Sequence, residues 1–309
     1  MAKAASKIYK ATGVVLKKTK LGETDLIITL LDTEGKHLQA VVKGARKPGS
    51  RIGCACELYS HCELTLNQGK SLDIVTDARL ISANRACCSS LMQSFAAAVV
   101  AEFVEKCSRD GGSDQRILPL CLAALTALGK ARDADLEFLV AASLLKIIAQ
   151  IGFRPELEQC AICGDSLTDI SDSSIVAKNE SGVGTQAGAN NEELLHFSTK
   201  YDLKTSEAGE ANGVSKSTLR FSTNDGGVIC DKCLPHSQVA VIKLSVTGLR
   251  LIKLAIYSRY EELLQMLANC ANPLLLSQLL MPIAKEMMVV HLGIQLKSLQ
   301  FFNTHAQQG

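Results

Sequence analysis

Apolar and polar residues alternate over short stretches in the first 80 residues, a pattern typical of β-strands. The stretches rich in Val, Ile and Leu are separated by turn sequences such as Thr33-Glu34-Gly35-Lys36 and Asn67-Gln68-Gly69-Lys70. We predict strands over residues 12–18, 25–31, 37–43, 58–66 and 72–80. Five short strands joined by glycine-containing turns indicate a small closed barrel, for which the OB-fold is the leading candidate. Residues 44–53 form a basic, glycine-containing loop between the third and fourth strands.

From residue 84 the apolar spacing becomes helical. Helices are predicted over residues 84–107, 114–128, 134–151, 245–257, 261–270 and 283–302, with Pro282 setting the start of the last, and a short strand over 220–229. Residues 167–219 are rich in Ser, Asn, Gly and Thr and lack an apolar pattern, so we expect a disordered insertion. The fold class predicted is α+β multidomain: an N-terminal OB-fold barrel in residues 1–82 and a helical domain in residues 83–309.

Four cysteines form two Cys-x-x-Cys pairs, Cys160/Cys163 and Cys230/Cys233. Each pair directs two thiolates into one space, and two pairs complete the tetrahedral sulfur site that a structural Zn²⁺ requires. The 66 residues between the pairs exceed the usual spacing of about 15–20, and the predicted insertion accounts for the excess. We predict one structural zinc ion held by segments 160–164 and 228–233. One alternative is that the thiols are only packed cysteines and bind no metal. Another is that His196 or His236 serves as a ligand of the metal.

The other eight cysteines are interpreted as small core or surface thiols, kept reduced in the cytoplasm because no export signal is evident. A second metal site at Cys54, Cys56 and Cys62 is a weaker alternative. Residues 1–10 lack the apolar core of a signal peptide, and we find no uninterrupted apolar run of about 18 residues, so we expect no membrane association.

Charge is distributed unevenly along the chain. The net charge is +2, yet residues 1–51 hold eleven Lys and Arg against four Asp and Glu, a local net charge of +7. Such a concentration suits a polyanionic partner, although a solvated basic surface has the same composition. We find no Walker motif, Gly-x-Ser-x-Gly or His-Glu-x-x-His, so a non-enzymatic role is expected. Glu23 and Asp25 would suit a metal-dependent nuclease only with further ligands that nothing supplies.

Several motifs, in order, resemble the RecO family of bacterial recombination mediators. These are Gly13-Val14-Val15-Leu16, Gly22-Glu23-Thr24-Asp25, Lys43-Gly44-Ala45-Arg46, Ser50-Arg51, Gly152-Phe153-Arg154-Pro155-Glu156-Leu157, Cys160-Ala161-Ile162-Cys163-Gly164, Gly226-Gly227-Val228-Ile229-Cys230, His291-Leu292-Gly293 and Leu296-Lys297-Ser298. The resemblance implies an OB-fold, a helical domain and often a structural zinc. It also implies binding of single- and double-stranded DNA, strand annealing, and help in loading RecA on coated single strands. The implied partners are RecR and the acidic C-terminal tail of single-strand DNA-binding protein, and the implied location is cytoplasmic and nucleoid-associated.

With this resemblance, the N-terminal cations become candidate DNA contacts: Lys17, Lys18, Lys20, Lys43, Arg46, Lys47 and Arg51. Only Tyr9 and Tyr59 precede Phe95 among aromatic residues, and the chain has no Trp, so little base stacking is expected from the barrel.

For the tail of single-strand DNA-binding protein the candidate cations are Arg250, Lys253, Arg259 and Lys297. The alternatives are a zinc-containing transcription regulator, which would need a basic recognition helix, and a non-catalytic scaffold.

Overall fold

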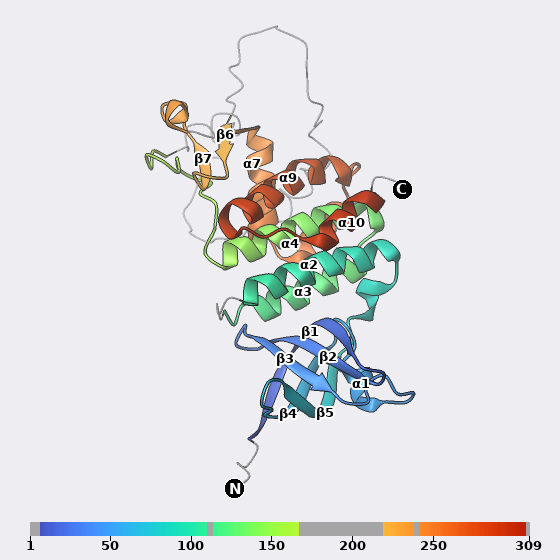
Figure 1. Ribbon diagram of the computed structural model, residues 1–309. Helices are drawn as coiled ribbons and strands as arrows, with labels where there is room; N and C mark the ends of the chain where they lie inside the picture. The colour runs from blue at the N-terminus through green and yellow to red at the C-terminus, as the bar shows by residue number, and fades with distance from the viewer. Residues whose placement is uncertain (1–6, 110–113, 167–218, 238–240, 307–309) are drawn as a thin grey trace, which may run out of the picture. The chain divides into compact units, whose positions relative to one another are not determined.

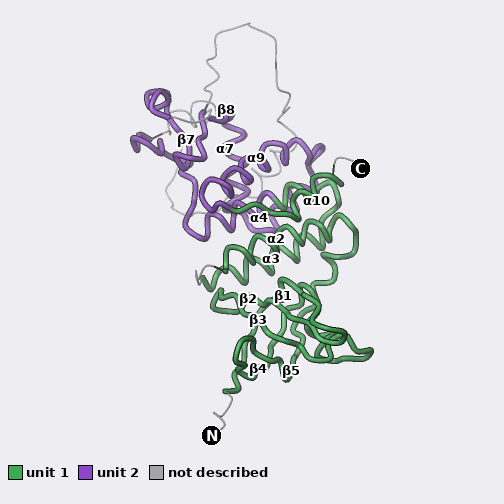
Figure 2. The backbone as a smooth tube through the Cα atoms, in the orientation of Figure 1, with its two compact units in different colours: residues 1–140, 294–309 green, residues 141–293 purple. Residues whose placement is uncertain are grey.

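The computed structural model describes residues 7–109, 114–166, 219–237 and 241–306. The chain forms two compact units, residues 1–140 with 294–309 and residues 141–293 (Figure 2). Most of the predicted insertion, residues 167–218, lies outside the described residues.

The first unit begins with a closed five-stranded barrel of OB type, which confirms the predicted fold class (Figure 1). Its strands are β1 (Ile8–Leu21), β2 (Asp25–Asp32), β3 (His37–Val42), β4 (His61–Asn67) and β5 (Asp73–Ser82). They pair in the order β1-β2-β3-β5-β4, and β1 also pairs with β4 to close the barrel. Only the β3–β5 pairing is parallel.

Alternation along each strand places one apolar set inside the barrel. The buried core consists of Val15, Ile28, Leu30, Ala40, Val42, Cys56, Cys62, Leu64, Leu66 and Val75. An irregularity between Val15 and Lys17 shifts the register of β1 against β2 and bends this long strand. One strand can therefore pair with both neighbours and still close the barrel.

A short helix that the sequence pattern did not reveal, α1 (Arg51–Ala55), follows the basic loop. The Ser50 hydroxyl caps it by accepting the backbone N–H of Gly53 at 3.1 Å. A Cβ at Gly53 would lie 2.2 Å from the carbonyl oxygen of Ala45, so glycine allows the helix to lie close against the loop. Five residues are too few to show helical periodicity, which is why residues 44–53 were expected to be loop throughout.

Helices complete the first unit: α2 (Leu91–Arg109), α3 (Ile117–Lys130) and α10 (Lys297–Ala306), with 3₁₀ turns at Arg85–Cys88 and Asp133–Asp135. The helix α2 packs against β1, β2 and β3 on one side and against α3 and α10. The next helix, α4 (Leu136–Gln150), contains the point where the second unit begins. The last strand of the barrel ends at Ser82, the last residue of the predicted OB-fold domain. The division of the chain into domains 1–82 and 83–309 stays a prediction.

The second unit contains the helices α7 (Val246–Tyr257), α8 (Tyr260–Ala268) and α9 (Pro273–Leu292), and a small antiparallel sheet. The sheet strands β6 (Leu219–Ser222), β7 (Gly227–Ile229) and β8 (Ile242–Leu244) pair in the order β7-β6-β8, with a 3₁₀ turn at Leu234–His236 after β7. The single strand predicted over residues 220–229 is wrong: β6 and β7 form a hairpin whose turn contains Gly226, at φ +80°. Turn geometry of this kind favours glycine.

The predicted last helix, residues 283–302, is also wrong. Pro282 lies inside α9, which ends at Gly293 with φ +62°, and a separate α10 follows. Buried Leu276, Leu280 and Met287 keep helical spacing across the proline, so packing maintains the helix where local preference would end it. Among the described helices α9 alone is long and apolar enough to cross a membrane, but 44% of that stretch is buried within the structure, as in a core helix.

Candidate nucleic-acid interface and metal centre

The basic loop between β3 and α1 is built from two successive turns. The N–H of Lys47 donates to the Gly44 carbonyl at 3.1 Å, and that of Ser50 donates to the Lys47 carbonyl at 3.1 Å. Gly44 and Gly49 have φ of +63° and +75°, values that favour glycine. The turns leave Lys43, Arg46, Lys47 and Arg51 exposed within nine residues of chain. This arrangement concentrates positive charge at one edge of the barrel.

The turn between β1 and β2 holds this loop in place. The Asp25 carboxylate accepts the N–H of Gly44 at 2.7 Å and the hydroxyl of Thr24 at 2.9 Å. The Gly44 N–H, then the Thr24 hydroxyl and nearby Lys43 and Lys47, lower the pKa of Asp25 below its usual value. Asp25 therefore serves as a structural acceptor in this turn.

Arg46 also joins the loop to the β1–β2 turn, and its contacts are called the clamp below. Its guanidinium donates to the carbonyl oxygens of Gly22 at 3.2 Å and Glu23 at 2.7 Å, and its backbone N–H donates to Thr24 at 2.9 Å. These contacts fix the loop to the β1–β2 turn. Arg46 therefore differs from the other loop cations, because its guanidinium already donates hydrogen bonds to backbone carbonyl oxygens of the protein.

The three candidate lysines of β1 do not share one environment. Lys18 forms an ion pair with Glu57 at 2.6 Å, whereas Lys17 and Lys20 are exposed. Since side chains alternate along a strand, Lys17 lies on the opposite face of β1 from Lys18 and Lys20. Within the described part of the chain, no acidic side chain lies within ion-pair distance of Lys17, Lys20, Lys43, Lys47 or Arg51.

The two barrel tyrosines are both engaged in the fold. Tyr59 is 3% exposed. Tyr9 is half-buried and donates its hydroxyl to the Asp73 carboxylate; burial and that contact raise its pKa to about 12. Neither ring lies open on the surface, so the candidate interface on the barrel offers cations and backbone amides.

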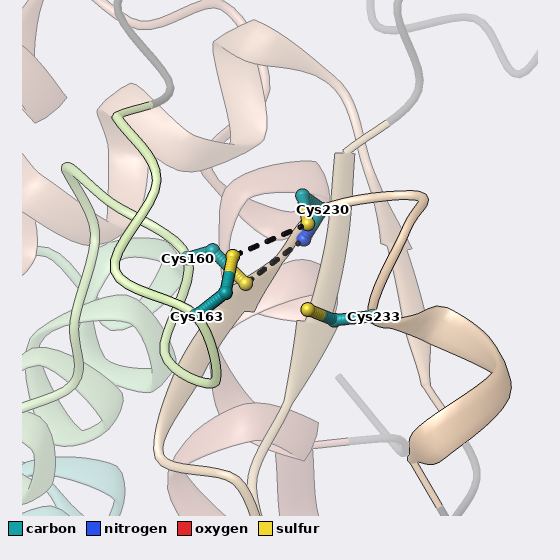
Figure 3. Close-up of side chains that lie close together, drawn as sticks. All are labelled: Cys160, Cys163, Cys230 and Cys233. Carbon is teal, nitrogen blue, oxygen red and sulfur yellow. Dashed lines mark hydrogen bonds between the residues drawn. The ribbon is translucent and has the colours of Figure 1, made fainter.

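The four predicted metal ligands lie together in the second unit (Figure 3). The sulfurs of Cys160, Cys163, Cys230 and Cys233 lie within 4.8 Å of one another. The Cys163 and Cys230 sulfurs are 3.7 Å apart, too far for a disulfide and near the ~3.8 Å expected between thiolates around a tetrahedral zinc. The arrangement suits one Zn²⁺ with no position left for a substrate.

Each Cys-x-x-Cys pair and its flanking backbone is called a knuckle below, the first at Cys160/Cys163 and the second at Cys230/Cys233. Backbone hydrogen bonds join the two knuckles. The Ala161 N–H donates to the Val228 carbonyl at 2.8 Å, and the Val228 N–H donates to that of Glu156 at 2.9 Å. A Cβ on Gly227 would lie 2.3 Å from the Glu156 carbonyl oxygen, so glycine allows this approach. Segments 156–161 and 227–230 are therefore held side by side although 66 residues separate Cys163 from Cys230.

Even without a bound metal, the surroundings of one cysteine favour its thiolate form. Burial raises the pKa of Cys160, but backbone N–H groups of Cys163, Cys230 and Ile162 outweigh burial and lower it to about 6. Burial and the neighbouring sulfurs raise the pKa of Cys233 to about 12. A divalent cation would relieve the repulsion between thiolates, since coordinated thiols are deprotonated.

The weaker alternative of a metal site at Cys54, Cys56 and Cys62 is not formed. Cys56 and Cys62 lie in the barrel core, whereas Cys54 is exposed. Contact with Cys62 and burial raise the pKa of the Cys56 thiol above its usual value. This accounts for the cysteine pair near the basic loop: one thiol fills the core and the other faces solvent.

The cations suggested for a peptide tail fall into two groups. Arg250, Lys253 and Arg259 belong to the second unit, where Lys253 lies 3.7 Å from a carboxylate oxygen of Glu158. Lys297 belongs to the first unit, at the start of α10. Sequence patterns missed two ring contacts close to this group, Phe153 with His291 and Arg154 with Tyr257, because their partners lie more than 100 residues apart in sequence.

Comparison with known proteins agrees with these features. Residues 6–84 match the family description "Recombination protein O N terminal" and residues 88–200 match "Recombination protein O C terminal". The second knuckle lies beyond both matches. The chain is 26% identical over 246 residues to DNA repair protein RecO of Symbiobacterium thermophilum, covering 80% of this chain and 79% of that protein.

Other relatives align over a shorter region. DNA repair protein RecO of Roseiflexus sp. is 30% identical over 163 residues, 53% of this chain and 56% of the relative. That of Bifidobacterium longum subsp. infantis is 34% identical over 161 residues, 51% of this chain and 66% of the relative. Against these two the chain spans less than two thirds of the relative's length. Taken with the closed barrel and the two family matches, which run through most of residues 6–200, these similarities show that the chain belongs to the RecO family of DNA repair and recombination proteins.

Proposed function

We propose that the chain is a non-enzymatic mediator of recombination repair that binds single- and double-stranded DNA and anneals complementary strands. The observation that carries the proposal is the exposed cationic loop on the barrel, in a chain that belongs to the RecO family. Lys43, Lys47 and Arg51 have no acidic partner within ion-pair distance in the described structure, so they are available to phosphates.

Binding by this loop is dominated by phosphates. Cations neutralise the backbone and release counterions, which gives affinity without reading sequence. Because the barrel tyrosines are buried or engaged, this surface favours single strands over duplex only weakly. That property suits annealing, in which the protein contacts both the unpaired strands and their duplex product.

The proposed partners are RecR and the acidic C-terminal tail of single-strand DNA-binding protein, and the proposed role includes helping to load RecA on coated single strands in the cytoplasm. The zinc ion has a structural role here, because four sulfurs would occupy every tetrahedral position. The cations lie on strands, a loop and a five-residue helix, which favours this function over that of a transcription regulator with a basic recognition helix.

The test is annealing of two complementary oligonucleotides coated with single-strand DNA-binding protein. We compare the wild type with a Lys43→Ala/Lys47→Ala/Arg51→Ala variant, in which Arg46 is kept because it holds the loop in place. A matched control, Lys36→Ala/Lys70→Ala/Lys130→Ala, removes three exposed cations of the same unit. We expect the wild type and the control to anneal and the loop variant to lose most of the rate.

Each other result has a defined meaning. Equal annealing by all three proteins would keep the activity and contradict the loop as the DNA surface. If both triple variants lost activity equally, net charge and not the loop would be responsible. If the wild type failed to anneal, the proposal would be wrong and a scaffold role would come first.

A further inference from the structure

The second unit exposes aromatic rings that the proposed function does not use, beside cations that were considered above for a peptide tail. The helix α4 ends at Gln150, and Gly152, at φ +108°, lies in the turn that follows. The next two residues contact side chains at the ends of two other helices. Phe153 stacks on His291 of α9, with ring centroids 5.2 Å apart and planes inclined by 22°. The Arg154 guanidinium lies over the ring of Tyr257, the last residue of α7, at 5.7 Å. These four residues are called the ring patch below.

Two members of the ring patch are large aromatic residues that are open to solvent. Phe153 is 39% exposed and Tyr257 is 55% exposed. Exposed rings in groups commonly mark binding surfaces, because isolated proteins rarely leave such area uncovered. Each exposed ring is also held by a stacked partner, which reduces the conformational entropy lost when a ligand contacts it.

Positive charge accompanies the rings. Arg154 and Arg259 are exposed, and no carboxylate of the described residues forms an ion pair with either guanidinium, although the Glu262 carboxylate accepts the backbone N–H of Arg259 at 2.9 Å. Lys253, one turn before Tyr257 on α7, is 3.7 Å from Glu158 and is therefore partly neutralised. The surface suits a ligand that is both planar and anionic.

We infer that the ring patch binds unpaired bases of single-stranded nucleic acid, with Phe153 and Tyr257 stacking on bases and Arg154 and Arg259 contacting phosphates. Stacking on aromatic side chains and salt links to phosphates are the two components of sequence-tolerant strand binding. A peptide made of acidic residues alone would use the cations and leave the two rings without a role. The inference rests on the proposed DNA binding but not on the barrel loop.

The test compares three ligands of equal length: an oligothymidylate, an abasic strand that keeps the phosphates, and a duplex. Tyr257→Ala and Phe153→Ala are each expected to weaken oligothymidylate binding by at least about fivefold, the lower limit for one lost base stack. Binding of the abasic strand and the duplex is expected to stay unchanged. Tyr257→Phe keeps the ring and should retain wild-type affinity, and Phe301→Ala, which removes a 62% exposed ring elsewhere, is the matched control.

The other outcomes overturn the inference in distinguishable ways. Equal losses for oligothymidylate and the abasic strand would mean that the patch contributes through charge or fold and not by stacking. Unchanged binding of all three ligands would remove the patch from strand recognition. Loss limited to an acidic peptide assayed in parallel would assign the surface to a protein partner. If the wild type bound no strand, the proposed function would fail with the inference.

Discussion

At the scale of single residues, Glu102 shows how one carboxylate joins distant parts of the first unit. It lies on α2 and accepts the N–H of Lys297 at 3.1 Å and that of Ser298 at 2.8 Å, at the start of α10. The Ser298 hydroxyl donates to it at 2.5 Å. Partial burial raises the pKa of Glu102, but these hydrogen bonds, with one from Lys106, outweigh burial and lower it to about 2. Free N–H groups at a helix start are thereby satisfied by a side chain from another helix.

We therefore expect Glu102→Gln to lower the free energy of unfolding by ~1–2 kcal/mol at neutral pH, a value reduced for solvent screening of a partly exposed group. The folded-state pKa lies below the usual 4.5, so the stabilisation is present above that value and is lost as pH falls toward about 2. Urea unfolding at a series of pH values measures it. Glu23→Gln, at an exposed carboxylate, is the control; a difference that stays constant down to pH 2 would contradict the account.

At the scale of structural elements, the two knuckles depend on each other. The segments that carry them are joined by backbone hydrogen bonds, and their four sulfurs lie close enough to share one ion. Replacement of one ligand leaves three thiolates, which repel one another and bind zinc poorly.

We expect Cys230→Ser to reduce zinc from about one ion per chain to near zero and to lower the thermal stability of the second unit. Cys270→Ser, outside the cluster, should change neither quantity. Metal analysis of both purified variants and their melting curves make the comparison. Wild-type zinc content and stability in Cys230→Ser would favour the alternative that these thiols are only packed cysteines.

Elements were predictable where the sequence carries a repeating pattern or a fixed spacing. Alternation identified all five barrel strands, and Cys-x-x-Cys spacing identified four residues that the fold brings together across 66 intervening positions. The interior Pro282 was misjudged because a buried apolar face outweighs its local effect. The helix α1 is too short to show a period, and the clamp of Arg46 on the β1–β2 turn depends on tertiary contacts that no local pattern encodes.

At the scale of the whole molecule, the two surfaces differ in the physical force that each would use. The barrel loop presents cations without open aromatic rings, whereas the ring patch presents exposed rings beside two arginines. Contacts to phosphates make affinity fall steeply with salt, while stacking between a ring and a base depends on salt very little. The salt dependence of single-strand binding therefore separates the two contributions in one protein.

We expect the plot of log affinity against log salt for oligothymidylate to become shallower by about two units when Lys43, Lys47 and Arg51 are replaced by alanine, since each phosphate contact on a single strand contributes about 0.7. Tyr257→Ala should instead lower the affinity by the same factor at every salt concentration and leave the slope unchanged. Fluorescence anisotropy titrations from low to high salt measure both quantities. A slope that the loop variant does not change would mean that its cations contact no phosphates, and a slope that Tyr257→Ala does change would mean that this ring acts by holding Arg154 in place and not by stacking on bases.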